Sequence, residues 1–235
     1  MIYKEEIKFL RGEEFDRGIV IKNPNNELKF RNKLLTNMAL NNKILHVGFV
    51  DHLPLIDKKI MDSNWLHNQL IQSSQKCVGI DINMEGVEYL QNKYKINNIY
   101  AFDILSDRLP VEIKDETFDF LFLPDVIEHI GNPVLFLTEL KKKLPNVKKF
   151  VITTPNAFCY DNFKLTLVGK ECINTDHRFW FTPYTLSKIL TDSGYKLNSL
   201  LFVEHGKRLS RRTVFKNFII KKIPQLRSTL VMEIE

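Results

Sequence analysis

Short apolar runs alternate with longer amphipathic stretches along this chain of 235 residues. The apolar runs have strand length and are rich in branched and aromatic side chains, so we predict that they are strands. There are seven of them, at 43–48, 77–82, 99–104, 118–123, 150–154, 197–203 and 229–234. Helix-length segments between such runs indicate parallel strands joined by crossover helices. The predicted fold class is therefore α/β, with a doubly wound, seven-stranded, mostly parallel Rossmann-like sheet.

Helical spacing of apolar residues and capping signals predict the intervening helices. The segments are 28–41, 55–74, 84–94, 133–144 and 183–194. Asn132-Pro133 and Thr182-Pro183 each place a capping side chain before a proline at the first helical position, and Gly194 ends the last helix. Because no repeat or low-complexity linker interrupts the pattern, we predict a single domain over 1–235, with a helical extension over 1–41.

The composition is that of a globular chain, with 44% hydrophobic and 26% charged residues. No apolar run reaches the length of about 18 residues that a membrane span needs, and the first residues lack the apolar core of a signal peptide. The 3 cysteines have no paired spacing, and no histidine, cysteine or acidic residues repeat at ligand spacing. We therefore predict a cytoplasmic protein without a disulfide framework and without a metal site.

The net charge of +6 comes from one segment, because residues 206–232 hold eight basic side chains and no acidic one. Apolar residues recur there at helical spacing, which predicts a basic amphipathic helical segment over 206–227, between the sixth and seventh strands. Two interpretations remain. The helix packs its apolar side on the sheet, or residues 207–223 contact an anionic membrane or a phosphorylated glycan carrier.

The carboxyl ends of the strands are where such sheets bind ligands. Gly48 ends the first predicted strand, where a glycine permits a tight turn and close approach to a ligand, or makes only a turn. Asp81 in the second strand is suited to accepting hydrogen bonds from ribose hydroxyls, or else caps the helix that begins near Met84. Asp103, after the third strand, is suited to the exocyclic amine of an adenine packed on Ile104, or is a solvated loop residue.

The fourth strand is followed by the densest polar cluster at any predicted strand end. Asp125, Glu128 and His129 lie within five residues and are interleaved with Val126 and Ile127. A segment that is half apolar and half ionisable at a sheet edge is typical of a cleft lining, rather than of a solvated helix start.

Taken in order, these segments resemble the class I S-adenosylmethionine-dependent methyltransferases. They are KILHVG, CVGIDIN, YAFDILSD, FDFLFLPDVIEHIGNP and VITTPN. The DVIEHI-x-NP segment is similar to the ubiquinone-type and sugar-type small-molecule branch. The resemblance covers about residues 40–205 and implies S-adenosylmethionine as cofactor, with the last strand antiparallel. The cofactor-binding residues that it implies are Gly48, Phe49, Asp81, Ile82, Asp103, Ile104, Pro124 and Asp125.

Methyl transfer to a hydroxyl requires alignment and the removal of one proton. Histidine is suited to that role, and His129 and His177 are the candidates expected at the cleft. Glu128 is the third catalytic candidate; alternatively it caps a helix or holds His129. We assign His46 and His52 to the cofactor loop, and expect His67 and His205 to be peripheral.

Residues 155–181 are long for a loop and rich in aromatic side chains, which suits a sugar ring. The segment also resembles methyltransferases of surface-polysaccharide pathways. The predicted function is methylation of a hydroxyl, or an amine, of a sugar or glycan precursor. The family usually has an acidic residue at position 46 and glycines at 50 and 52, so a non-catalytic scaffold is the first alternative. A nucleic-acid methyltransferase is the lower alternative, because Leu-Pro-Asp-Val follows the fourth strand instead of the Asn/Asp-Pro-Pro-aromatic segment of base-amine enzymes.

Overall fold

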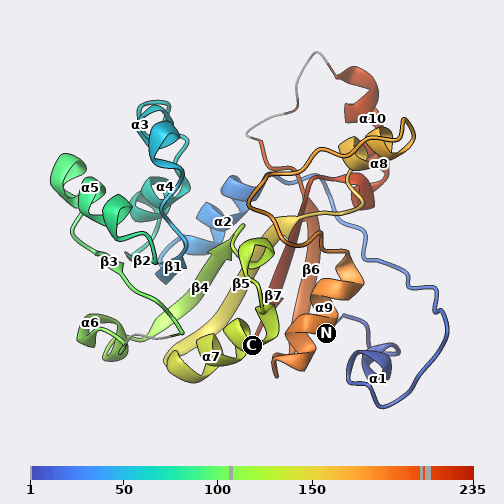
Figure 1. Ribbon diagram of the computed structural model, residues 1–235, viewed down its shortest axis with the longest axis horizontal. Helices are drawn as coiled ribbons and strands as arrows, with labels where there is room; N and C mark the ends of the chain where they lie inside the picture. Colours follow the sequence, from blue (N-terminus) through green and yellow to red (C-terminus); the bar gives the residue numbers. More distant parts are fainter. Residues whose placement is uncertain (1, 106–107, 207–208, 210–212) are drawn as a thin grey trace.

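A single seven-stranded sheet forms the centre of the computed structural model, which describes residues 2–105, 108–206, 209 and 213–235 (Figure 1). The strands lie in the order β3-β2-β1-β4-β5-β7-β6. Their bounds are β1 Lys43–Val47, β2 Lys76–Asp81, β3 Ile99–Ala101, β4 Phe118–Pro124, β5 Val147–Pro155, β6 Leu197–Val203 and β7 Thr229–Ile234. β7 runs antiparallel to both β5 and β6, while the other pairings are parallel. The predicted fold class and the antiparallel last strand are confirmed.

The register brings the carboxyl ends of the parallel strands to one edge. Val47 of β1 pairs with Ile80 of β2, and Pro124 of β4 pairs with Thr153 of β5. The polar residues that follow these strands therefore meet at one place, as the strand order of a doubly wound sheet requires.

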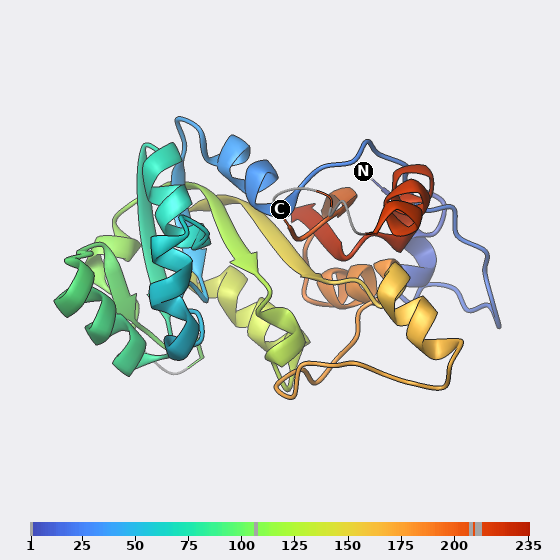
Figure 2. The same ribbon diagram turned by 90° about the horizontal axis from the view of Figure 1, so that it is seen from above.

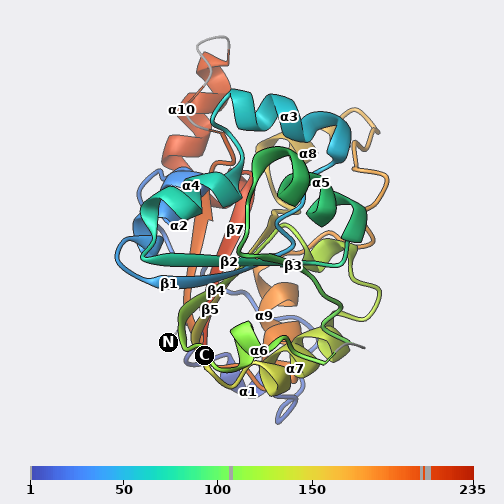
Figure 3. The same ribbon diagram turned by 90° about the vertical axis from the view of Figure 1, so that its left-hand side faces the viewer.

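Helices cover both faces of the sheet (Figure 3). On one face, α2 and α4 pack Leu35 and Leu70 against Phe122 and Val151 of the sheet. On the other, α1, α7 and α9 contribute to the largest core cluster. The bounds are α1 Ile7–Leu10, α2 Arg31–Ala39, α4 Leu66–Ser73, α5 Met84–Tyr94, α6 Val111–Lys114, α7 Pro133–Lys143 and α9 Pro183–Asp192. Within the described ranges, no helix has both the length and the apolar character that crossing a bilayer demands.

Local hydrogen bonds explain where several helices begin. The side chain of Asn83 accepts from the Gly86 N–H and caps α5, so the alternative that Asp81 caps this helix is wrong. Asn132 caps α7 in the predicted way, and Thr182 forms a capping box at the start of α9.

The helix predicted over 55–74 is instead two helices, α3 Leu53–Met61 and α4. The break lies at Ser63, whose φ of 48° is left-handed, and the Trp65 indole then donates to the Phe49 carbonyl at 3.0 Å. α3 buries Ile56 beside Phe49 and Trp65, whereas α4 buries Leu66 and Leu70 against the sheet, and the run of apolar residues alone does not reveal this change.

Three further predictions need correction. β3 ends at Ala101 and not at 104, so Asp103 does follow the strand, and the segment 155–181 includes a helix, α8 Tyr160–Thr166. The extension 1–41 is helical only in α1 and α2. The basic segment contains α10 Val214–Lys222 and the short helix η2 Pro224–Leu226, while residues 207–208 and 210–212 lie outside the described residues. Seen from above, α8 and α10 lie at the opposite end of the molecule from α5 (Figure 2).

Candidate functional site

A cavity of about 960 Å³ lies at the carboxyl edge of the sheet. Its walls come from the ends of β1, β2, β3 and β4, the start of α2 and the loop before α9. This volume is in the range of cofactor and small-molecule sites. All the residues that the sequence predicts for the cofactor and for catalysis line it: Gly48, Phe49, Asp81, Ile82, Asp103, Ile104, Pro124, Asp125, Glu128, His129 and His177.

Gly48 occupies a position that only glycine fits. Its φ is +73°, in the left-handed region, and a Cβ there would lie 2.2 Å from Cγ2 of Val126. The Gly48 N–H donates to the Ile80 carbonyl at 2.9 Å, which fixes the turn beside β2. The turn after β1 thus passes close under the segment that follows β4.

Asp81 holds the loop after β1 in place. One carboxylate oxygen accepts from the Val50 N–H at 2.7 Å and the other from the Asn83 N–H at 2.9 Å. Only 8% of the residue is exposed, and this burial raises the pKa of the carboxyl. Asp81 is therefore a fixed acceptor at the cavity wall, with lone pairs left on both oxygens.

The end of β3 supplies a second acidic group and an apolar wall. Asp103 accepts from the Leu105 N–H at 2.9 Å, and Ile104 is buried beside it. Ile82, which follows β2, is exposed and lines the same cavity. The Phe49 ring packs instead against Trp65 and His67, so it supports the loop from within the core.

Asp125 follows β4 in a strained conformation with a φ of 54°. Its N–H donates to the Thr153 carbonyl at 2.9 Å, and its carboxylate accepts from the Thr153 hydroxyl at 2.9 Å. It also pairs with Arg31, the first residue of α2. Burial lowers the pKa of Arg31 to about 10, which leaves it charged at neutral pH. Nothing in the sequence pattern distinguishes Arg31 from the solvated basic residues nearby, so its place at the cavity is not predicted.

Two histidines form a buried pair beneath the cavity. The Nδ1 atoms of His46 and His67 lie 3.0 Å apart, so one ring donates and the other accepts. Burial lowers the pKa of His67 to about 3 and that of His46 well below 6.5. The prediction of a peripheral His67 is wrong, since α4 turns it into the core, and His46 is a buried β1 residue as well as a cavity wall.

His205, also predicted to be peripheral, lies at the cavity. Its Nδ1 is 3.8 Å from an Asp125 carboxylate oxygen. β6 ends just before this residue, so the antiparallel part of the sheet delivers it to the same edge.

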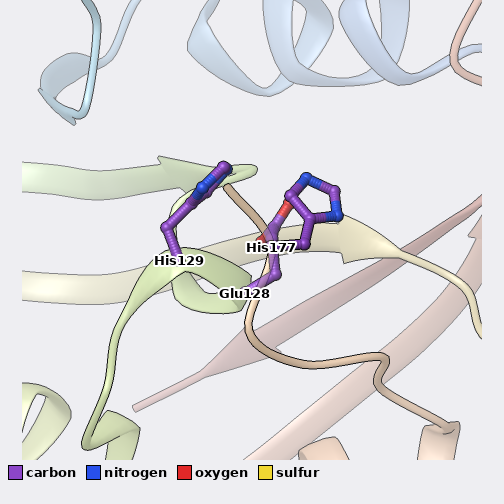
Figure 4. A group of neighbouring side chains, drawn as sticks. All are labelled: Glu128, His129 and His177. Carbon is purple, nitrogen blue, oxygen red and sulfur yellow. The ribbon is translucent and has the colours of Figure 1, made fainter. Parts of the chain in front are cut away.

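Glu128, His129 and His177 form a compact cluster (Figure 4). Glu128 has 0% exposure, and burial raises the pKa of its carboxyl to about 7. Its Oε2 accepts from the Thr154 hydroxyl at 3.0 Å, so β5 orients this carboxylate, and not a helix end or His129. The two imidazole rings lie 4.7 Å apart at 87°.

The aromatic residues of 155–181 divide between core and surface. Phe181 is buried, whereas Phe158 and Phe163 are about half exposed. A second cavity of about 370 Å³ lies beside α8 and is bordered by Trp180, whose indole donates to Glu171 at 3.0 Å. This segment therefore lines a second, smaller cavity.

Comparison with known proteins gives one family match. A family model described as a methyltransferase domain matches residues 61–200. A search of curated protein sequences gave no match.

Solved structures share the fold at low sequence identity. A SAM-dependent methyltransferase from Aquifex aeolicus aligns over 87% of this chain and 89% of its own, with 19% identity and a TM-score of 0.51. Magnesium protoporphyrin IX methyltransferase from Synechocystis PCC 6803, solved with bound SAH, aligns over 86% and 80%, with 12% identity and a TM-score of 0.52. The small RNA methyltransferase HEN1 aligns over 92% of this chain but 27% of its own, with 15% identity and a TM-score of 0.55.

Proposed function

Because the chain belongs to the methyltransferase domain family, we propose that it transfers the methyl group of S-adenosylmethionine to a hydroxyl, or an amine, of a sugar or glycan precursor. One observation carries the proposal. Eleven residues singled out by sequence, spread from position 48 to position 177, line a single cavity at the carboxyl edge of the sheet.

The residues present fit S-adenosylmethionine. The cavity offers fixed acidic acceptors at Asp81 and Asp103 for the ribose and the adenine amine, and an apolar wall at Ile104. Gly48 lets the backbone approach the ligand, and the buried guanidinium of Arg31 is the cation suited to the methionine carboxylate. These are the partners that each part of this cofactor requires.

The cofactor supplies an electrophilic methyl group on a sulfonium, so the chain's own residues have to orient the acceptor and take up one proton. His129 and His177 are the groups available. Burial, and next the proximity of His129, lower the pKa of His177, which keeps its ring neutral and able to accept a proton at neutral pH. Glu128, beside them in the cavity wall, is the third candidate, since burial raises the pKa of its carboxyl to about 7, where it can exchange a proton near neutral pH.

A sugar acceptor is supported by the resemblance of the 155–181 segment and by the smaller cavity beside α8, which Trp180 borders. The test is release of S-adenosylhomocysteine, measured by chromatography, with nucleotide-linked sugars offered one at a time. Single-stranded RNA belongs in the same panel for the nucleic-acid alternative. We expect turnover with at least one sugar and a loss of that turnover in the double variant His129→Ala/His177→Ala. Turnover with RNA alone would replace the sugar proposal.

We also propose that the α10 region contacts anionic membrane. The interpretation in which this helix packs its apolar side on the sheet is wrong, because Ile220 is its buried residue, while Phe215 is 69% and Phe218 62% exposed. Lys221 and Lys222 end the helix. The other basic residues of the proposed 207–223 contact include Lys207, Arg208, Arg211 and Arg212, which lie outside the described residues.

Sedimentation with vesicles tests this contact. We expect more protein to sediment with vesicles containing phosphatidylserine than with phosphatidylcholine vesicles, and we expect the difference to disappear in Phe215→Ser/Phe218→Ser. Because both side chains are exposed, that variant keeps its fold. Equal recovery with both vesicles would reject the proposal.

A further inference from the structure

The cluster of Glu128, His129 and His177 has a feature that a proton-transfer role does not require. One ligand atom from each residue, a carboxylate oxygen and two ring nitrogens, all lie within 4.8 Å of one another. Two nitrogens and one oxygen are a donor set that divalent transition metals bind.

Two of the polar atoms in the cluster are buried without a partner among the described residues. They are Oε1 of Glu128 and Nδ1 of His177. A buried polar atom without a hydrogen-bond partner costs free energy, on the order of 1–3 kcal/mol. Two such atoms in one cluster therefore indicate a missing ligand. The other oxygen of Glu128, Oε2, is already bonded to Thr154, and the Glu128 side chain lies beside the His177 ring (Figure 4).

The surroundings orient the ligands in the way that metal sites do. Nδ1 of His129 lies 3.1 Å from the Asp176 carbonyl, so Nδ1 carries the proton and donates to that carbonyl. Nε2 therefore keeps an unshared lone pair that can bind a metal ion. The loop that carries His177 is tied to the cluster, because the Arg178 N–H donates to the Glu128 carbonyl at 2.8 Å. The three ligands come from segments about 50 positions apart, and their places are fixed by backbone contacts.

We propose that Glu128, His129 and His177 bind one divalent transition-metal ion. The sequence-based prediction of no metal site depended on ligand spacing along the chain, whereas this set combines two neighbouring residues with a distant third. All three side chains line the main cavity, so three protein ligands leave coordination positions open toward it.

The open positions give the ion a role that rests on the proposed function. An acceptor hydroxyl bound to the ion would have a lowered pKa and would lose its proton to water, because His129 and His177 then use their lone pairs to bind the ion. Its oxygen would then form the bond to the methyl carbon as the carbon–sulfur bond of the sulfonium breaks, releasing S-adenosylhomocysteine. The ion would thus favour an oxygen acceptor over an amine.

Titration of the full chain, without a histidine tag, with Co²⁺ tests the site. We expect one equivalent to bind with visible d–d absorption, and Zn²⁺ to displace it. In His129→Ala, in His177→Ala and in Glu128→Gln, which keeps the side-chain volume, we expect the dissociation constant for Co²⁺ to rise by about tenfold or more. His52→Ala is the matched control, because His52 lines the same cavity outside the cluster and should leave the titration unchanged.

Circular dichroism shows whether each variant is folded, and the half-buried positions of His129 and His177 make their alanine variants the decisive ones. No saturable absorption change with the wild-type chain, or an unchanged affinity in both alanine variants, would overturn the metal site. Calorimetry of the metal-free chain with S-adenosylhomocysteine separates the two proposals. Binding of S-adenosylhomocysteine without Co²⁺ uptake would refute the metal site and leave the proposed methyltransferase function intact. Co²⁺ uptake without binding of S-adenosylhomocysteine would refute the proposed function and leave the metal site intact.

Discussion

The buried pair of His46 and His67 makes the stability of the fold depend on pH in a way that one substitution isolates. His67 has an ordinary pKa of 6.5 when unfolded and a pKa of about 3 in the folded chain, because burial disfavours its charged form. Below pH 6.5 the unfolded chain binds a proton that the folded chain does not. The stability that neutral His67 contributes is therefore complete above pH 6.5 and is lost progressively as the pH falls toward 3.

The size of the effect follows from linkage. Each pH unit within this window costs about 1.4 kcal/mol, so between pH 7 and pH 5 the free energy of unfolding falls by about 2 kcal/mol through His67 alone. In His67→Asn a polar atom still faces His46 but does not titrate. We expect the variant to be less stable than wild type at pH 7, and that deficit to shrink by about 2 kcal/mol at pH 5.

Urea unfolding, followed by tryptophan fluorescence at pH 7, 6 and 5, measures the difference. Carboxylates that titrate in the same range change the free energy of unfolding of wild type and variant equally, so their effect cancels in the difference between the two. The exposed His52 provides the control, since His52→Asn should run parallel to wild type. If the stability curve of His67→Asn also runs parallel to that of wild type, His67 is not a buried neutral histidine and the reasoning fails.

Three further outcomes test other parts of the structure. Gly48→Ala should weaken S-adenosylhomocysteine binding at least tenfold, measured by calorimetry, because the new Cβ would lie 2.2 Å from Val126. Adding Val126→Ala to the same chain should recover part of the affinity. Arg31→Gln should raise the dissociation constant for S-adenosylhomocysteine more than for adenosine, which has no carboxylate; equal effects on both ligands would refute the assigned contact. Burial raises the pKa of Cys77 to about 12, so a disulfide reagent at pH 8 should label the exposed Cys172 within minutes and Cys77 only after unfolding, as mass spectrometry of peptides would show.

The sheet could be predicted from the sequence because its strands are buried on both faces, which leaves continuous apolar runs. The strand ends then follow from connectivity, and the rule that ligands bind at carboxyl ends selects Asp81, Asp103 and Asp125 without any coordinates. β3 was predicted too long because the apolar residues Phe102 and Ile104 continue the pattern after the ladder ends; they are buried as cavity lining and not as strand.

Other parts of the site depend on contacts that no local pattern encodes. Arg31 belongs to the cavity because α2 begins beside β4, and only the folded chain brings it to Asp125. The burial of His67 depends on how α4 rotates against β2. The metal-binding cluster forms because the loop that carries His177 reaches Glu128, whose carbonyl accepts from the Arg178 N–H. Pairwise contacts between distant segments are thus the part that periodicity and spacing do not determine.

Calorimetric titration with S-adenosylhomocysteine measures whether the cavity at the carboxyl edge of the sheet binds the methyl donor. We expect saturable binding of one equivalent with a dissociation constant well below millimolar, weakened at least tenfold in Asp81→Asn, since the amide loses the charge that strengthens hydrogen bonds from the ribose. No heat of binding at millimolar ligand would contradict this expectation and would favour a methyltransferase fold that serves as a scaffold.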